Sequence, residues 1–210
     1  MPSAGRVFYT LALNGGYGSI SDLEAGEGAY LSDYLDLCYV AGLKGTDFKK
    51  ILSAERVDMQ TKVTLSNTLI SGYAPKGKIS LLMKSLAAIA RERRPDAAAF
   101  DYYMKCESLG LRFTEGTRLA RMTAIDSIMC PGYRYSSYKS PGKLDSGFAS
   151  KAEKFYSGQF AKMNDGVLAI VGDISEEALK KVLLEYVGSF PTTETAFRRP
   201  VVKYQPVSGW

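Results

Sequence analysis

The sequence contains no histidine among its 210 residues. Imidazole is the commonest catalytic base near neutral pH and the commonest zinc ligand in proteins. Its absence excludes Ser-His-Asp triads, Cys-His dyads and His-based metal sites from this chain. Any chemistry that depends on imidazole must therefore be supplied by a partner.

Long apolar runs and paired cysteines are also missing. No stretch approaches the ~18 apolar residues that a membrane-spanning helix requires, and the N-terminus lacks the basic-then-apolar layout of a secretion signal. Cys38, Cys106 and Cys130 form no C-x-x-C pair, so we expect buried small side chains rather than a disulfide framework. We expect a soluble chain without a membrane span, and the compartment stays open between cytoplasm and periplasm.

Patterns for binding nucleic acid or phosphate are weak. The net charge of +5 is spread among single Lys and Arg residues. The densest basic cluster, Arg91 to Arg94, is interpreted as the solvated end of a helix. The phosphate loop G-x-x-x-x-G-K-[ST] is absent, and tyrosines fall on predicted core faces as often as on loops. We therefore expect no nucleic-acid partner.

The sequence has the composition of a folded domain, with 46% apolar and 23% charged residues. Strand and helix patterns are mixed without regular βαβ alternation, which predicts a two-layer α+β fold. We expect one α+β domain over residues 1–190. For residues 191–210 we expect an extended tail or linker toward a missing following domain, because prolines recur in this segment and the sequence resembles a piece of a longer chain.

Hydrophobic periodicity predicts the individual elements. The strand patterns cover residues 6–20, 57–73 and 166–174. The last of these is a continuous apolar run suited to a central strand. The helix patterns cover residues 29–43, 79–94, 97–112, 118–129 and 175–188, together with a helix that begins at a cap on Asp145 and continues through Phe160. Asp96 is a good N-cap for the helix over 97–112.

The segment from Lys151 to Pro191 carries a family-like pattern. A helix with an F-Y pair leads through N-x-x-x-x-x-V-G-D into a helix that starts with acids and ends at a Gly and a Pro. The matching residues are Phe155, Tyr156, Asn164, Val171, Gly172, Asp173, Gly188 and Pro191. This pattern resembles the insulinase (pitrilysin) family of zinc metalloproteases, and specifically its mitochondrial processing peptidase-like members.

The front of the chain matches the same family in position. The segment GEGAYLSDYLDL resembles the family's glycine-rich approach and zinc motif, H-x-x-E-H. Tyr30 and Tyr34 stand at the two His positions, and Asp33 stands at the Glu position. Glu107, which lies 73 residues after Tyr34, corresponds to the family's third zinc ligand, a Glu on a later helix.

The chemistry of these degenerate positions argues against metal binding. In the active motif, imidazoles at i and i+4 share one helix face and hold zinc, while the Glu is the base for the metal-bound water. A phenol of pKa ~10 is mostly protonated at neutral pH and is a poor zinc ligand. We therefore expect a filled pocket at Tyr30, Asp33, Tyr34 and Glu107, with no metal and no catalytic residue in this chain.

The resemblance implies a non-catalytic domain of an insulinase-like zinc metallopeptidase. Such a domain would pack on a catalytic half that carries the zinc and would wall the chamber that holds the peptide substrate. The catalytic half is either a missing part of the same polypeptide, which the open chain ends favour, or a separate subunit.

Two alternatives remain open from the sequence. The chain could be a free-standing, metal-free structural or peptide-binding subunit of the same fold. It could also be a hydrolase that uses Asp33 and Glu107 as an acid and base pair.

Overall fold

The structure is a computed structural model, and it describes residues 5–24, 26–112, 116–129 and 146–192. Its main feature is a four-stranded antiparallel sheet in the order β3-β4-β1-β6. The strands are β1 (Arg6–Asn14), β3 (Asp58–Val63), β4 (Asn67–Pro75) and β6 (Val167–Gly172). A small second sheet pairs β2 (Tyr39–Val40) with β5 (Arg93–Arg94).

Helices of very different length complete the described part of the chain. The α-helices are α1 (Leu31–Tyr34), α2 (Gly45–Ala54), α3 (Ile79–Arg91), α4 (Ala97–Arg112), α5 (Arg118–Met129), α6 (Ser146–Phe160) and α7 (Glu176–Tyr186). The 3-10 helices are η1 (Tyr17–Ser19), η2 (Glu27–Tyr30), η3 (Leu35–Leu37), η4 (Lys76–Lys78), η5 (Met163–Asp165) and η6 (Val187–Ser189). Within the described residues, no helix is both long and apolar enough to cross a membrane.

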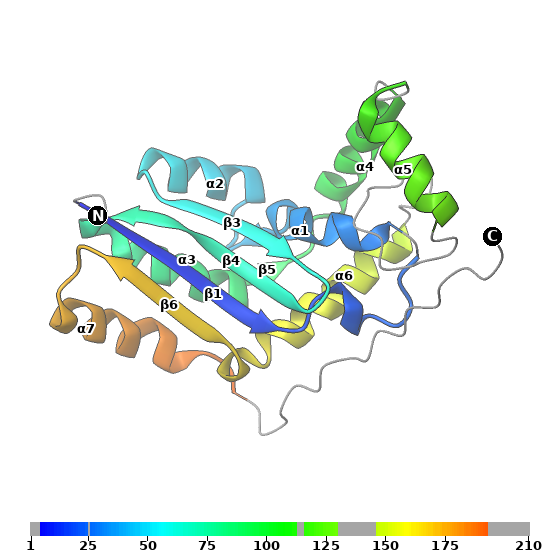
Figure 1. Cartoon of the computed structure of the whole chain (residues 1–210). Helices are drawn as coiled ribbons and strands as arrows, with labels where there is room; N and C mark the ends of the chain where they lie inside the picture. Colours follow the sequence, from blue (N-terminus) through cyan, green and yellow to red (C-terminus); the bar gives the residue numbers. More distant parts are fainter. Residues whose placement is uncertain (1–4, 25, 113–115, 130–145, 193–210) are drawn as a thin grey trace.

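The core lies between the sheet and the helices behind it. Figure 1 shows the sheet from its open side, with α3 behind it and α4 and α5 projecting together as an arm. Strand β1 alternates, and its inward side chains Val7, Tyr9, Leu11 and Leu13 are buried. In the register of the sheet Leu11 stands opposite Ile70 on one side and Leu168 on the other, so this face of the sheet is mostly apolar and packs against the helices.

The other face of the sheet is solvent-exposed and partly apolar. Phe8 stands between Val171 on β6 and Tyr73 on β4, and the Phe8 and Tyr73 rings lie 6.1 Å apart. Phe8 is 41% exposed, while Val167 and Val171 are 68% and 64% exposed. We call these four residues, Phe8, Tyr73, Val167 and Val171, the outer sheet patch.

The structure confirms the two-layer α+β class and several elements. Helix α4 begins after Asp96, whose carboxylate accepts a hydrogen bond from the Ala99 N–H at 3.1 Å. Helix α7 is capped by the Ser175 hydroxyl, with Glu176 and Glu177 in its first turn. Helix α6 ends at Phe160 as expected, and its buried inner face consists of Phe148, Ala152, Phe155, Tyr156 and Phe160. The expected cap at Asp145 and most of the 191–210 tail lie outside the described residues.

Two predicted elements are broken into shorter pieces. The helix expected over 29–43 is a short run of η2, α1 and η3 that ends at Leu37, because Tyr39 and Val40 pair as a strand and Ala41 takes a positive φ of 51°. The single strand expected over 57–73 is the β3–β4 hairpin. Its turn is fixed by Thr64, whose hydroxyl accepts from the Asn67 N–H at 3.0 Å.

Two further expectations were wrong about how exposed a segment is. The apolar run 166–174 forms an edge strand of the described sheet, rather than a central one, and its outward valines are exposed. The basic cluster is not fully solvated, because Arg93 forms an ion pair with Glu153 of α6 and its own side chain is only 5% exposed. Of the cysteines, Cys38 is buried as expected, Cys106 is exposed, and Cys130 lies outside the described residues.

Candidate functional site

The predicted site begins at the short helical run that follows Gly26. Gly26 has a φ of 87°, a conformation that favours glycine, and η2 starts directly after it. Tyr30 ends η2 and Tyr34 ends α1, and their side chains are only 1% and 3% exposed. The i, i+4 pair therefore points into the protein, toward helices α4 and α6, rather than to solvent.

Helix α4 presents its own polar groups to this pair. The Tyr103 hydroxyl donates a hydrogen bond of 2.6 Å to Asp33, and the Tyr103 ring meets Tyr30 edge to face at 6.4 Å. Glu107 lies one helical turn after Tyr103, so both side chains share one face of α4. Burial is the main cause that raises the pKa of Tyr30 and Tyr103, and the negative charge of Glu107 adds to the effect on both. The structure thus brings Tyr30, Asp33 and Tyr103 together, with Glu107 one turn further along α4.

Tyr34 faces a different set of partners. Its hydroxyl donates to Glu153 of α6 at 3.4 Å, and its ring stacks on Tyr156 at 6.0 Å. Glu153 also accepts from Arg93 at 2.6 Å and from the Ser157 hydroxyl at 2.8 Å. Tyr34 is therefore held in a hydrogen-bonded network with Glu153, Arg93 and Ser157.

Aromatic rings fill the space between the helices. Phe100 and Phe148 stack at 6.0 Å, and each also contacts one of the two tyrosines, Phe100 meeting Tyr34 and Phe148 meeting Tyr30. We call this set the aromatic cluster: Tyr30, Tyr34, Phe100, Tyr103, Phe148 and Tyr156. Such ring pairs add about 0.5–1.5 kcal/mol each beyond their buried area, so the cluster stabilises the junction of α1, α4 and α6.

The phenols of the cluster are held in their neutral form. Burial, with the Glu107 and Asp33 carboxylates, raises the pKa of Tyr30 to about 12. Burial and the hydrogen bond to Asp33 raise the pKa of Tyr103 above its ordinary value, and burial raises that of Tyr34. A protonated phenol donates hydrogen bonds and does not compete for zinc.

The donor set does not fit the zinc ion that the family's motif holds. Tyr30 and Tyr34 are neutral phenols, and Asp33 already accepts the Tyr103 hydrogen bond. Among the residues that the structure describes, no group of three or more His, Cys, Asp or Glu side chains could hold a metal ion. The arrangement instead offers neutral donors to fixed carboxylates, which is the chemistry of a packed polar core.

Sequence reasoning found part of this site and missed the rest. Tyr30, Asp33, Tyr34 and Glu107 were singled out by their match to a family motif. Tyr103, whose hydroxyl donates to Asp33, was not singled out, because no motif position marks it. Arg93 and Glu153 were missed because their pairing joins residues 60 positions apart. The i, i+4 spacing of Tyr103 and Glu107 was the one local signal for the α4 face.

Sequence comparisons alone find no relatives: no family model matches the chain, and no curated protein matches it. Solved structures do match. A protease from Helicobacter pylori superposes with a TM-score of 0.72 at 12% identity, over 96% of this chain and 49% of that one. The periplasmic protease PqqL from Escherichia coli gives 0.69 at 17% identity, over 94% of this chain and 22% of that one.

A third match is described as inactive. The peptidase M16 inactive domain from Pseudomonas fluorescens superposes with a TM-score of 0.68 at 13% identity, over 99% of this chain and 50% of that one. The chain thus spans between about a fifth and a half of the length of the proteins that it matches. Across nearly its whole length, the chain has the α+β fold of an M16 (pitrilysin-family) peptidase domain.

Proposed function

We propose that this chain is a non-catalytic domain of an M16 zinc metallopeptidase. The observation that supports the proposal is the Tyr30 to Tyr34 face, which resembles the family's zinc motif in its spacing along the sequence and presents two buried phenols. Its one motif carboxylate, Asp33, is bonded to Tyr103. A domain built this way contributes shape and surface, and the zinc and the hydrolytic step belong to a catalytic half.

The outer sheet patch supports packing against another domain. Phe8, Val167 and Val171 expose large apolar side chains on one face of the sheet, and contiguous exposed apolar residues typically mark interaction surfaces. The matched proteases are longer chains in which this fold accounts for 22% to 50% of the length. We assign the outer sheet patch to contact with the catalytic half, which leaves this domain as one wall of the peptide chamber.

Reconstitution tests this function. The isolated chain should not cleave a fluorogenic peptide library, with or without added zinc. When it is mixed with the H-x-x-E-H-bearing half from the same source, the two should co-elute, and peptide cleavage should rise well above that of the catalytic half alone. Cleavage by the isolated chain, or full activity of the catalytic half without it, would contradict the proposal.

A further inference from the structure

Strand β6 lies at an open edge of the sheet. The strand order is β3-β4-β1-β6, and within the described residues β6 pairs with β1 alone. Helix α7, which follows β6, packs against α3 on the helical side of the sheet (Figure 1). The free edge of β6 is therefore in a position to accept one more strand.

The backbone groups of β6 are divided between its two sides. The Asp173 N–H donates to the Arg6 carbonyl at 3.1 Å, and bonded pairs alternate along an antiparallel ladder. Every second residue of β6 back from Asp173 is therefore bonded to β1, whereas the N–H and C=O groups of Leu168 and Ile170 point to the free edge. Among the described residues these groups have no hydrogen-bond partner.

The two edges of the sheet are protected differently. Edge strands of natural sheets usually carry charged side chains, prolines or bulges, which discourage pairing with another chain. Strand β3, at the opposite edge, has Asp58 and Lys62. Strand β6 has the sequence VLAIVG, which contains neither charge nor proline. An edge of this kind indicates a strand that pairs on both sides in the assembled protein.

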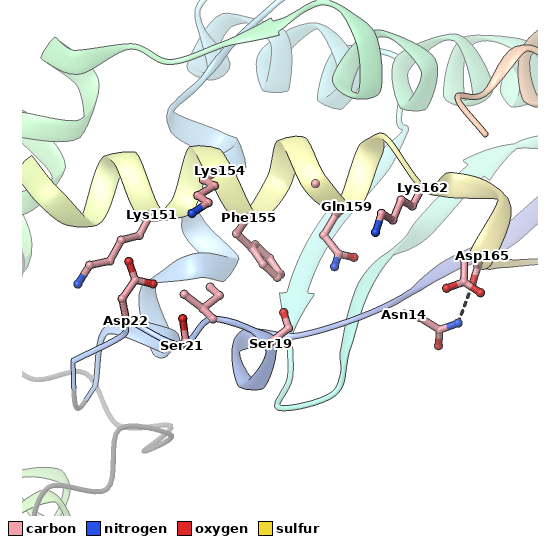
Figure 2. A pocket seen from close by; sticks show the side chains of 12 residues that line it. Asn14, Ser19, Ser21, Asp22, Lys151, Lys154, Phe155, Gln159, Lys162 and Asp165 are labelled. Carbon is pink, nitrogen blue, oxygen red and sulfur yellow. Dashed lines mark hydrogen bonds between the residues drawn. The ribbon is translucent and has the colours of Figure 1, made fainter. Parts of the chain in front are cut away.

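Both ends of β6 are held in place. Figure 2 shows the first contact, in which Asn14 Nδ2 donates to the Asp165 carbonyl at 2.6 Å, just before the strand. Just after the strand, the Asp173 carboxylate pairs with Lys76 at 2.6 Å. The free edge is therefore a fixed template, and little conformational entropy is lost in β6 when a further strand pairs with it.

The sequence of β6 is symmetric about Ala169. Residues 166–172 read GVLAIVG, and reversing this run leaves the same class of side chain at every position. When two copies of β6 pair antiparallel with Ala169 on a two-fold axis, Val167 of each copy lies opposite Val171 of the other, and such cross-strand apolar pairs stabilise a sheet. This symmetry favours a second copy of the chain over an unrelated strand, since a two-fold interface must be complementary to itself.

We propose that two copies of this chain pair through β6 and join their four-stranded sheets into one continuous sheet. In the register centred on Ala169, Leu168 of each copy faces Ile170 of the other, and the outward N–H and C=O groups of both residues become hydrogen-bonded. The outer sheet patch stays on the open face of the joined sheet. This proposal does not rest on the proposed function, because it is tested on the isolated chain.

Sedimentation of the full chain tests the association. The 23.0 kDa chain should sediment as a dimer at ~100 μM and dissociate on dilution, with a dissociation constant between ~1 and ~50 μM, as expected for a small interface. The Leu168 and Ile170 amides should exchange hydrogen at least about tenfold more slowly in the dimer than in the dilute monomer. A monomer at ~100 μM, or open-ended association beyond the dimer, would overturn the proposal.

Cysteine cross-linking tests the register. The two Ala169 residues of the dimer would face each other in a non-hydrogen-bonded pair, with Cα atoms ~4.5 Å apart, which is within disulfide range. Ala169→Cys, in a background with Cys106→Ser and Cys130→Ser, should therefore form a covalent dimer on mild oxidation. Val171→Cys, on the same strand and face, is the matched control and should cross-link at least about fivefold less. Equal yields in the two, or no cross-link in Ala169→Cys, would contradict the proposed pairing.

A proline variant separates edge pairing from side-chain packing. Because the Ile170 N–H points away from β1, Ile170→Pro leaves the ladder with β1 intact but removes a donor that the second copy requires. Ile170→Ala is the matched control, since it shortens the same side chain and keeps the N–H. The dimer dissociation constant should be at least about tenfold higher in Ile170→Pro than in Ile170→Ala. Equal constants in the two folded variants would contradict the proposal, and the cross-linking yields decide it if Ile170→Pro does not fold.

Discussion

Replacing imidazole with phenol changes what the Tyr30 to Tyr34 face can do. An imidazole offers a lone pair to a metal near neutral pH, whereas a buried phenol offers a proton to a carboxylate. Tyr103 donates to Asp33 and Tyr34 donates to Glu153. The carboxylates Asp33 and Glu153 therefore have protein donors as partners, and we expect this face to serve packing rather than metal binding.

The hydrogen bond between Tyr103 and Asp33 should make a measurable contribution to the free energy of unfolding. Tyr103→Phe removes the hydroxyl that donates to Asp33 and should lower the free energy of unfolding by about 1–2 kcal/mol, measured by urea denaturation. Tyr102→Phe is the matched control, since Tyr102 is 70% exposed, and it should change stability by less than about 0.5 kcal/mol. Equal effects of the two variants would show that the Tyr103 hydroxyl is not a stabilising donor.

Stability should fall at alkaline pH because of the buried phenols. Tyr30 has its pKa raised to about 12 in the folded chain, against an ordinary value of ~10. The folded state therefore holds its proton more tightly than the unfolded state. The stability that this provides is complete below pH ~10 and is lost as pH rises toward ~12.

The alkaline loss is checked with urea midpoints measured across that pH window. In Tyr30→Phe the decline should be shallower than in the parent, because one raised pKa is removed. A parallel decline in both chains would mean that Tyr30 titrates normally in the folded state.

At the scale of elements, the sequence was most informative where local signals agreed. Helices α4, α5 and α7 were predicted within a residue or two because periodicity and terminal signals coincide, with caps at Asp96 and Ser175 for α4 and α7. The β3–β4 hairpin was missed because its turn at Thr64 to Asn67 contains no glycine or proline. The 29–43 helix was overextended because Tyr39 and Val40 form strand pairs with residues more than fifty positions away.

The candidate site was predictable only in part, for the same reason. A motif match points to positions, so it found Tyr30, Asp33, Tyr34 and Glu107, but it does not show which residues pack against them. The pairing of Arg93 with Glu153 depends on how α6 packs beside β5, which no local pattern encodes.

The cap of α4 provides a test at this scale. Asp96→Ala removes the acceptor for the Ala99 N–H and should cost about 1 kcal/mol of unfolding free energy. It should also loosen the Tyr103 and Glu107 face, seen as faster amide hydrogen exchange in the first turns of α4. Asp101→Ala, an exposed aspartate on the same helix, should leave both readouts close to the parent. No difference between the two variants would contradict the capping role.

At the scale of the whole molecule, helices cover one face of the sheet, and the other face stays exposed to solvent. The inner face is buried beneath helices, while the outer sheet patch exposes Phe8, Val167 and Val171. The edge strand β6 carries an apolar run on both its sides, as strands that are covered on both faces do. This mismatch between sequence and exposure is the reason to assign a further domain to the outer sheet patch.

Val171→Lys tests the outer sheet patch as an interface. The isolated variant should keep its stability within about 0.5 kcal/mol, because position 171 is exposed. Its affinity for the catalytic half should fall at least about tenfold, measured by calorimetry, because a charge would be buried at the contact. Leu184→Lys on the exposed side of α7 is the matched control. Unchanged affinity in Val171→Lys would remove the outer sheet patch from the interface.

Zinc content tests most directly whether the Tyr30 to Tyr34 face stands where M16 relatives bind their metal. The triple variant Tyr30→His, Asp33→Glu and Tyr34→His creates the H-x-x-E-H motif, with Glu107 as the candidate third ligand. If it folds, as judged by near-ultraviolet circular dichroism, it should bind about one equivalent of zinc that a chelator removes, while the parent chain holds less than ~0.1 equivalent. Adding Glu107→Gln should weaken that binding. A folded triple variant that takes up no zinc, or a parent chain with a stoichiometric ion, would contradict the account.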